Sequence, residues 1–204
     1  EEVSIEVGRE MSLNALRRAN ESFNSEIFLV SQIDPLVDYP NDNDLYEVGT
    51  ICRIVATHKK DNFSRVVFKG ISRAKIIDMK DMRNTKFASV EKLYDIIGDA
   101  QEELILVKKV SKEIEGLEAL ASLITPSMAK SFAKGVSANR LADRLAQIFP
   151  FSLNLRQELL ETLEVNARLL KLLEAIEKEK QLMMIENEIN QKVRNRVEES
   201  QKEY

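Results

Sequence analysis

Apolar and polar residues alternate over much of the first half of the chain, as they do in half-buried β-strands. A helix is expected from Glu10 to Ser22, where Leu13 and Leu16 recur at helical spacing. Gly70 is expected to interrupt the run of strands. The predicted strands are residues 3–7, 27–30, 50–57, 65–68, 71–79 and 87–94. Short polar turns join most of them, so we predict a small antiparallel sheet or barrel.

The pattern changes at Gly98, after which apolar residues recur every three or four positions, as in amphipathic helices. Asp99 is the expected N-cap of a first helix, and Ser137 that of another. Between them, Thr125-Pro126 has the composition of a helix start. The last quarter of the chain lacks glycine and proline, and Asn154 is its expected N-cap. These segments predict a helical bundle, and the whole chain an α+β protein.

The bundle is expected to end in a long protruding helix, with a break or shift near Asn166. Beyond Glu177 its apolar residues thin to a narrow seam among charged ones, and Glu164 and Arg168 have the spacing of a helical ion pair. The candidate contacts with a partner or substrate are Leu182, Met183, Met184, Ile185, Ile189, Val193 and Val197. For the two methionines, packing against a neighbouring helix is the favoured alternative.

We expect three parts: a β-rich subdomain (1–98), a helical bundle (99–178) and the start of a long helix (179–204). The final helix stops in mid-pattern without a C-cap, and no methionine begins the chain. Both observations suggest a piece of a larger protein.

Composition and charge exclude several function classes. The chain has 30 Lys and Arg against 34 Asp and Glu, which argues against a dedicated nucleic-acid binder. A basic sheet face built from Arg65, Lys69, Arg73 and Lys75 is more simply explained as a solvated surface. One histidine and one cysteine, Cys52, cannot supply a zinc site. No apolar run reaches the roughly 20 residues of a membrane helix, and the single cysteine suits a reducing compartment, so we expect a cytoplasmic location.

No catalytic or cofactor site is predicted for this chain. The six glycines stand too far apart for a phosphate-binding loop. Ser127 and Lys130 match the S-x-x-K pattern of a serine nucleophile and its base, but the companion motifs of that enzyme class are absent. A stand-alone hydrolase using this pair is therefore an unfavoured alternative to a plain helix start.

Several short segments, taken in order, carry a family pattern. They are Val7-Gly8-Arg9, Asp44-Leu45-Tyr46-Glu47-Val48-Gly49-Thr50, Val67-Phe68-Lys69-Gly70, Arg73-Ala74-Lys75-Ile76, Arg140-Leu141-Ala142-Asp143, Phe149-Pro150, Glu164-Val165-Asn166 and Val193-Arg194-Asn195-Arg196-Val197. In this order and spacing they resemble the N-terminal domain of the Lon family of ATP-dependent proteases. Residues 34–44, rich in proline, aspartate and asparagine, are expected to form a surface loop, and residues 34–43 depart from the commoner bacterial pattern.

The resemblance implies a non-catalytic region that recognises unfolded or damaged proteins and contributes to assembly. In the parent protein, a homohexamer, an AAA+ ATPase module using ATP and Mg²⁺ and a Ser-Lys protease domain would follow, and neither module's motifs occur here. The alternative is a protein-interaction scaffold that shares only the domain type.

Overall fold

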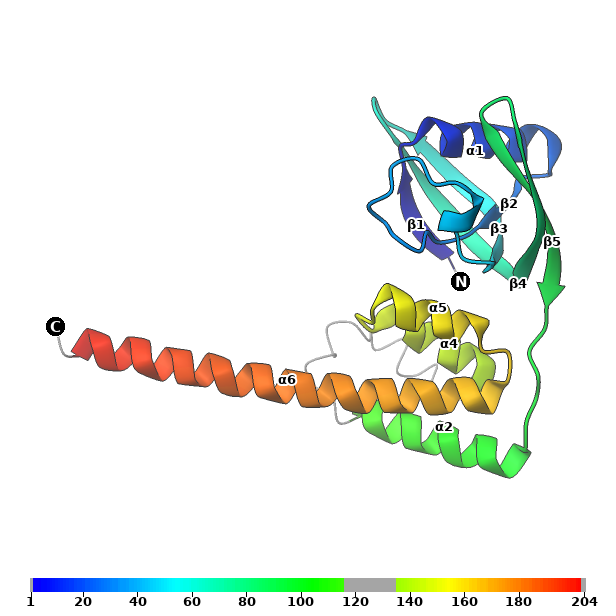
Figure 1. Ribbon diagram of the computed structural model, residues 1–204. Coiled ribbons are helices and arrows are strands. Elements are labelled where there is room, and N and C mark those ends of the chain that lie inside the picture. Colours follow the sequence, from blue (N-terminus) through cyan, green and yellow to red (C-terminus); the bar gives the residue numbers. More distant parts are fainter. Residues whose placement is uncertain (1, 116–134, 203–204) are drawn as a thin grey trace. The chain divides into compact units, whose positions relative to one another are not determined.

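The computed structural model describes residues 2–115 and 135–202. The chain divides into two compact units, residues 1–94 and residues 95–204 (Figure 1). The expected helix start at Thr125-Pro126 and the pair Ser127 and Lys130 lie outside the described residues.

The first unit is a five-stranded antiparallel sheet with one α-helix packed against it (Figure 1). The order of neighbouring strands is β1, β4, β3, β2, and β5 pairs with β4 as well. The predicted helix over residues 10–22 is confirmed, residue for residue. The elements in chain order are β1 (Glu2–Val7), α1 (Glu10–Ser22), β2 (Glu26–Leu29), the 3₁₀ turn η1 (Asp42–Asp44), β3 (Val48–Lys59), β4 (Ser64–Met82) and β5 (Thr85–Leu93).

Strand β4 is continuous, so the expected interruption at Gly70 is wrong. Cys52 of β3 pairs with Gly70 and Ile51 pairs with Ser72, which leaves Ile71 as an extra residue on β4. This is a β-bulge, a distortion next to which a glycine is common within a strand. The bulge bends β4 without ending it, so residues 64–69 pair with β1 and residues 73–82 pair with β5.

The core of the first unit is small and lies between the sheet and α1. Leu16 of α1 meets Cys52, Val66 and Phe68 of the two long strands, and the side chain of Phe68 is fully enclosed. Burial raises the pKa of the Cys52 thiol to about 11, because an ionised thiolate would lose its hydration there.

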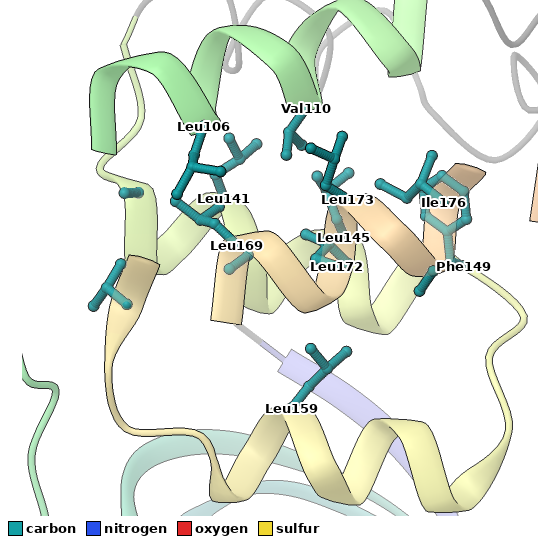
Figure 2. Close-up of a cluster of buried hydrophobic side chains, with 14 of the residues drawn as sticks. Leu106, Val110, Leu141, Leu145, Phe149, Leu159, Leu169, Leu172, Leu173 and Ile176 are labelled. Atoms are coloured by element: carbon teal, nitrogen blue, oxygen red, sulfur yellow. The ribbon is translucent and has the colours of Figure 1, made fainter. Parts of the chain in front are cut away.

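The second unit is a helical bundle around one apolar core (Figure 2). Its described helices are α2 (Ala100–Glu115), α4 (Ala138–Ile148), α5 (Leu153–Glu161) and α6 (Val165–Lys202). In Figure 2 the apolar side of α6 faces side chains from two other helices. They are Leu106 and Val110 of α2, Leu141 and Leu145 of α4, and Phe149, which follows α4. Leu169, Leu172 and Ile176 of α6 are completely buried, so the first third of the long helix belongs to the bundle.

Two predicted caps have different outcomes. Asp99 caps α2 as predicted, since its Oδ1 accepts a hydrogen bond of 2.8 Å from the backbone N–H of Glu102. Helix α5 is capped by Ser152 and not by Asn154, with a 3.2 Å bond from the Leu155 N–H to the Ser152 hydroxyl oxygen. The buried, stacked rings of Phe149 and Phe151 hold the preceding chain, and the helix begins two residues later.

The expected break near Asn166 is found three residues earlier, between the end of α5 and the start of α6. Asn166 itself lies buried in the first turn of α6. Counted from Val165, α6 runs for 38 residues without interruption, which at about 1.5 Å per residue is about 57 Å.

Candidate interaction surfaces

The predicted contact residues on α6 lie where the helix has left the bundle. Leu182, Met184, Ile185, Ile189, Val193 and Val197 are each 50–65% exposed. Met183 differs, because it packs against the bundle core and is only partly exposed. After Met183, every described residue of α6 is exposed. The structure therefore keeps one methionine of the pair for packing and leaves the other available to a partner.

The exposed apolar residues of α6 form a row along the helix. Ile185, Ile189, Val193 and Val197 are four residues apart, and four residues turn a helix by slightly more than one turn. The row consequently slants around the axis, which suits a short crossing with another helix better than a long parallel coiled coil. We call these four residues the α6 row.

A second surface lies in the first unit, on the loop between β2 and β3 that carries η1 (Figure 1). We call residues 30–47 the β2–β3 loop. Its neck is closed by backbone hydrogen bonds from Ile33 to Asp44, 2.8 Å, and from Tyr46 to Ser31, 3.0 Å. A β-bridge between Gln32 and Leu45 lies between them.

The part of the β2–β3 loop beyond the neck is also held by its own side chains. The Gln32 amide donates to the carbonyls of Asp34 and Val37, at 3.2 and 2.8 Å, and its oxygen accepts from Arg9. Asp34 Oδ1 accepts from the N–H of Leu36 at 2.9 Å. These bonds define one conformation for a segment that would otherwise be free to vary.

The other side of the β2–β3 loop is fixed by η1 and a lysine. Asn41 and Asp44 form a reciprocal capping box around η1. Lys86 of β5 donates to Asp42 at 2.8 Å and to Asp81 of β4 at 3.0 Å, and its side chain is only 15% exposed. Burial acts to lower the pKa of Lys86, but the hydrogen bonds and charges of the two aspartates outweigh burial and raise it. Lys86 therefore stays charged and ties the loop to the β4–β5 hairpin.

Two large apolar side chains project from this fixed loop. Leu36 is 87% exposed and Tyr39 is 93% exposed, more than any other large apolar residue in the described parts of the chain. We call Leu36 and Tyr39 the apolar tip. The sequence predicted only a surface loop here and did not reveal the tip. The feature that could have revealed it is a leucine and a tyrosine among prolines and aspartates, because a solvated turn needs no large apolar residue.

The basic sheet face is not a bare cationic surface. Arg65 pairs with Glu6 at 2.7 Å and Arg53 with Glu26 at 3.1 Å. Lys75 of β4 pairs with Glu47, at the end of the β2–β3 loop, at 3.3 Å. Carboxylates on neighbouring segments thus compensate Arg65 and Lys75, two of the four residues of that face, whereas a nucleic-acid surface needs uncompensated charges.

Cys52 is not a reactive thiol, because its raised pKa keeps it protonated near neutral pH. Within residues 2–115 and 135–202, no group of three or more His, Cys, Asp or Glu side chains is arranged to hold a metal ion. No helix in these same ranges combines the length and apolar character needed to cross a bilayer.

A buried ionic cluster holds the segment that enters the second unit, residues 95–99, which we call the connecting segment. The guanidinium of Arg168 is 1% exposed and lies 2.6 Å from Asp95 and 3.4 Å from Asp143 of α4. Its Nε donates to the Thr162 carbonyl at 2.9 Å. The sequence instead suggested an exposed helical pair with Glu164, and that assignment is wrong for the Arg168 side chain.

Backbone and amide contacts extend this attachment. Ile96 forms a parallel β-bridge with Glu164. The Ile96 N–H donates to the Leu163 carbonyl at 2.9 Å, and the Ile96 carbonyl accepts from the Val165 N–H at 3.0 Å. Asn166 donates to the Asp99 carbonyl and to the Glu102 carboxylate, at 3.0 and 3.1 Å. The connecting segment is thereby fixed to the first turn of α6.

Comparison with known proteins gives the family. The model of the ATP-dependent protease La (LON) substrate-binding domain matches residues 3–178. The chain belongs to the Lon substrate-binding domain family. The match ends just where α6 leaves the bundle, so the exposed half of α6 lies beyond it.

Relatives and solved structures agree with this assignment. The chain is 35% identical over 199 residues to a Lon protease of Fervidobacterium nodosum and 34% identical to that of Escherichia coli K12, and each match covers 97% of the chain. It spans about a quarter of the length of these curated relatives, 24% and 25%.

The fold matches the N-terminal domain of a Mycobacterium avium complex Lon protease. The TM-score is 0.69 at 17% identity, over 87% of this chain and 90% of the other. A Lon N-terminal domain protein from Xanthomonas campestris matches with a TM-score of 0.55 at 18% identity, over 85% and 88% of the two chains. The predicted α+β architecture and the family resemblance are both confirmed.

Proposed function

We propose that this chain is the non-catalytic, substrate-recognising and assembly region of a Lon-type protease. It binds unfolded or damaged proteins and passes them to an ATPase module and a Ser-Lys protease domain elsewhere in the same polypeptide. The parent is then an ATP-dependent serine endopeptidase of the AAA+ class, acting in the cytoplasm. ATP and Mg²⁺ belong to that missing module, and this chain itself needs no cofactor.

The observation that carries the proposal is the exposure of large apolar side chains on otherwise well-packed units. The apolar tip and the α6 row stand outside both cores, and each fully exposed leucine forgoes about 1.5–3 kcal/mol of burial free energy. An unfolded protein offers complementary apolar segments that its native form hides. Exposed apolar side chains therefore select for the unfolded state without reading a particular sequence.

The α6 row suits the assembly part of the proposal. A helix that extends beyond its bundle gains most of its stability from packing against something else. The other subunits of a homohexamer would supply that partner, with Leu182 and Met184 beside the α6 row at the start of the contact.

The binding proposal is tested with one protein in two states. Fluorescently labelled α-lactalbumin, either reduced and alkylated or native, is titrated with the chain. We expect saturable binding of the unfolded form and little binding of the native form. Equal binding of both forms, or none of the unfolded form, would contradict substrate recognition and favour a scaffold unrelated to proteolysis.

The absence of catalysis is tested separately. The purified chain is expected to release no phosphate from ATP and to cleave no unfolded protein. A serine-directed fluorophosphonate probe is expected to leave Ser127 unlabelled. Labelling of Ser127 that is lost in Lys130→Ala would instead support the hydrolase alternative.

A further inference from the structure

The β2–β3 loop combines three properties. Its backbone is fixed at the neck, at Gln32 and at η1. Lys86 attaches it to the neighbouring hairpin. Its two most prominent side chains are nevertheless apolar and almost wholly exposed. Binding residues are commonly found on loops that a rigid scaffold positions. A fixed loop also loses little conformational entropy when it binds, which favours affinity.

The charged residues within the loop that carries the apolar tip are all acidic. Residues 31–47 contain five acidic residues and no lysine or arginine. Lys86 compensates Asp42 and Lys75 compensates Glu47, both from outside the loop. Asp34 and Asp38 flank Leu36, Asp38 also lies next to Tyr39, and both carboxylates are on exposed residues. The five are Asp34, Asp38, Asp42, Asp44 and Glu47.

We propose that the apolar tip is a peptide-binding element that selects apolar segments flanked by lysine or arginine. Leu36 and Tyr39 contact the apolar side chains, and tyrosine offers a large contact area with few rotatable bonds. Asp34 and Asp38 attract the flanking cations and repel acidic segments, so charge supplies the selectivity and apolar contact the affinity. This inference rests on the proposed function and adds the class of segment that this surface prefers.

The test uses two short extended peptides with the same central run of leucine and phenylalanine. One is flanked on both sides by lysines and the other by glutamates. The chain is titrated with each by fluorescence anisotropy at low and at high salt. We expect the lysine-flanked peptide to bind several-fold more tightly, with a preference that shrinks as salt screens the charges.

Three variants locate the site. The double variant L36S/Y39S is expected to weaken binding of the lysine-flanked peptide about tenfold or more. Asp38→Lys should abolish or reverse the preference between the two peptides. Leu104→Gln is the matched control, because Leu104 is an exposed leucine, 56% accessible, on α2 of the other unit. It should bind like the unaltered chain. Circular dichroism and thermal unfolding should be unchanged in all three, because these side chains are exposed.

Several results would overturn the inference. The first is unchanged binding in L36S/Y39S, and the second is equal affinity for the two peptides. The third is concentration-dependent self-association, measured by sedimentation, that disappears in L36S/Y39S, because the tip would then be a contact between copies of this chain. If unfolded α-lactalbumin binds the unaltered chain and L36S/Y39S equally well, the tip fails as the recognition element while the proposed function stands. If the lysine-flanked peptide binds at the tip but unfolded α-lactalbumin does not bind, the tip stands and the proposed function fails.

Discussion

Arg168 Nη2 lies 2.6 Å from Asp95 Oδ1, although the two residues are 73 positions apart in the chain. Asn139 of α4 donates to the other oxygen of the same carboxylate at 3.1 Å. One carboxylate thus joins the connecting segment to both α4 and α6. Because the guanidinium is almost completely buried, this cluster depends on its charges remaining paired.

Replacing Arg168 with methionine is expected to destabilise the second unit by about 3–5 kcal/mol, since removing one partner of a buried ion pair leaves the other charge uncompensated. The measurement is urea unfolding followed by circular dichroism. Lys171→Met is the control, because Lys171 pairs with Glu158 at 2.6 Å on the surface and should cost less than about 1 kcal/mol. Similar losses for both variants would show that the Arg168 cluster has no special role.

Replacing Gly49 with alanine is expected to destabilise the first unit by about 1–3 kcal/mol or more, because the added methyl group would overlap its neighbours. A Cβ at this position would collide with the Leu29 carbonyl oxygen and lie 2.7 Å from Cζ of Phe28. Gly70→Ala is the matched control in the same sheet, where the nearest atom would be Thr50 Cγ2 at 3.7 Å. A control variant as unstable as Gly49→Ala would refute the steric explanation.

The buried thiol of Cys52 should make the first unit less stable in alkaline solution. Its folded pKa of about 11 lies above the value of about 8.5 expected in an unfolded chain. The unfolded state therefore loses its proton first, so stability is intact below about pH 8.5 and falls as the pH rises toward 11. Urea unfolding at several pH values should show a steeper alkaline loss in the unaltered chain than in Cys52→Ala. Parallel pH profiles would contradict the assignment to this thiol.

The two ends of α6 should differ greatly in hydrogen exchange. Amides near Leu172 are buried in the bundle, whereas every described residue after Met183 is exposed. At low concentration we expect exchange after about residue 188 to be faster by on the order of a hundredfold or more. Raising the concentration should slow it only if copies of the chain pair there. Slow exchange at this end in a strictly monomeric sample would remove the assembly role proposed for the α6 row.

The sequence predicts the parts of this fold that depend on local periodicity. Helix α1 is an example, because its apolar residues recur at one-turn spacing and polar residues bound it. Gly70 shows the limit, since a glycine can end a strand or stand at a bulge, and only the pairing with β3 decides between them. Ser152 and Asn154 are both good caps, and the choice depended on how the preceding phenylalanines pack.

The candidate surfaces were predictable to different degrees. The α6 row was visible because a long helix exposes its pattern directly in the sequence. The apolar tip was not, because the exposure of Leu36 and Tyr39 depends on hydrogen bonds from Gln32 and an ion pair from a distant strand. Arg168 was assigned to the surface because its spacing from Glu164 matches an exposed helical ion pair, whereas its actual partners come from other parts of the chain.

The parallel pairing of the connecting segment with the start of α6 also has a mechanical consequence. When the far end of α6 and residue 95 are pulled apart, the paired segments around Ile96 and Glu164 are drawn along each other in opposite directions. Their hydrogen bonds and the Arg168–Asp95 ion pair are then loaded together, in shear, instead of one after another. We expect the exposed half of α6 to unwind under tension before this junction opens, which force spectroscopy with handles at residues 95 and 202 would measure. Opening of the junction first would contradict that order. While the junction stays closed, tension on the long helix is therefore carried across it to residue 95, where the chain enters the second unit.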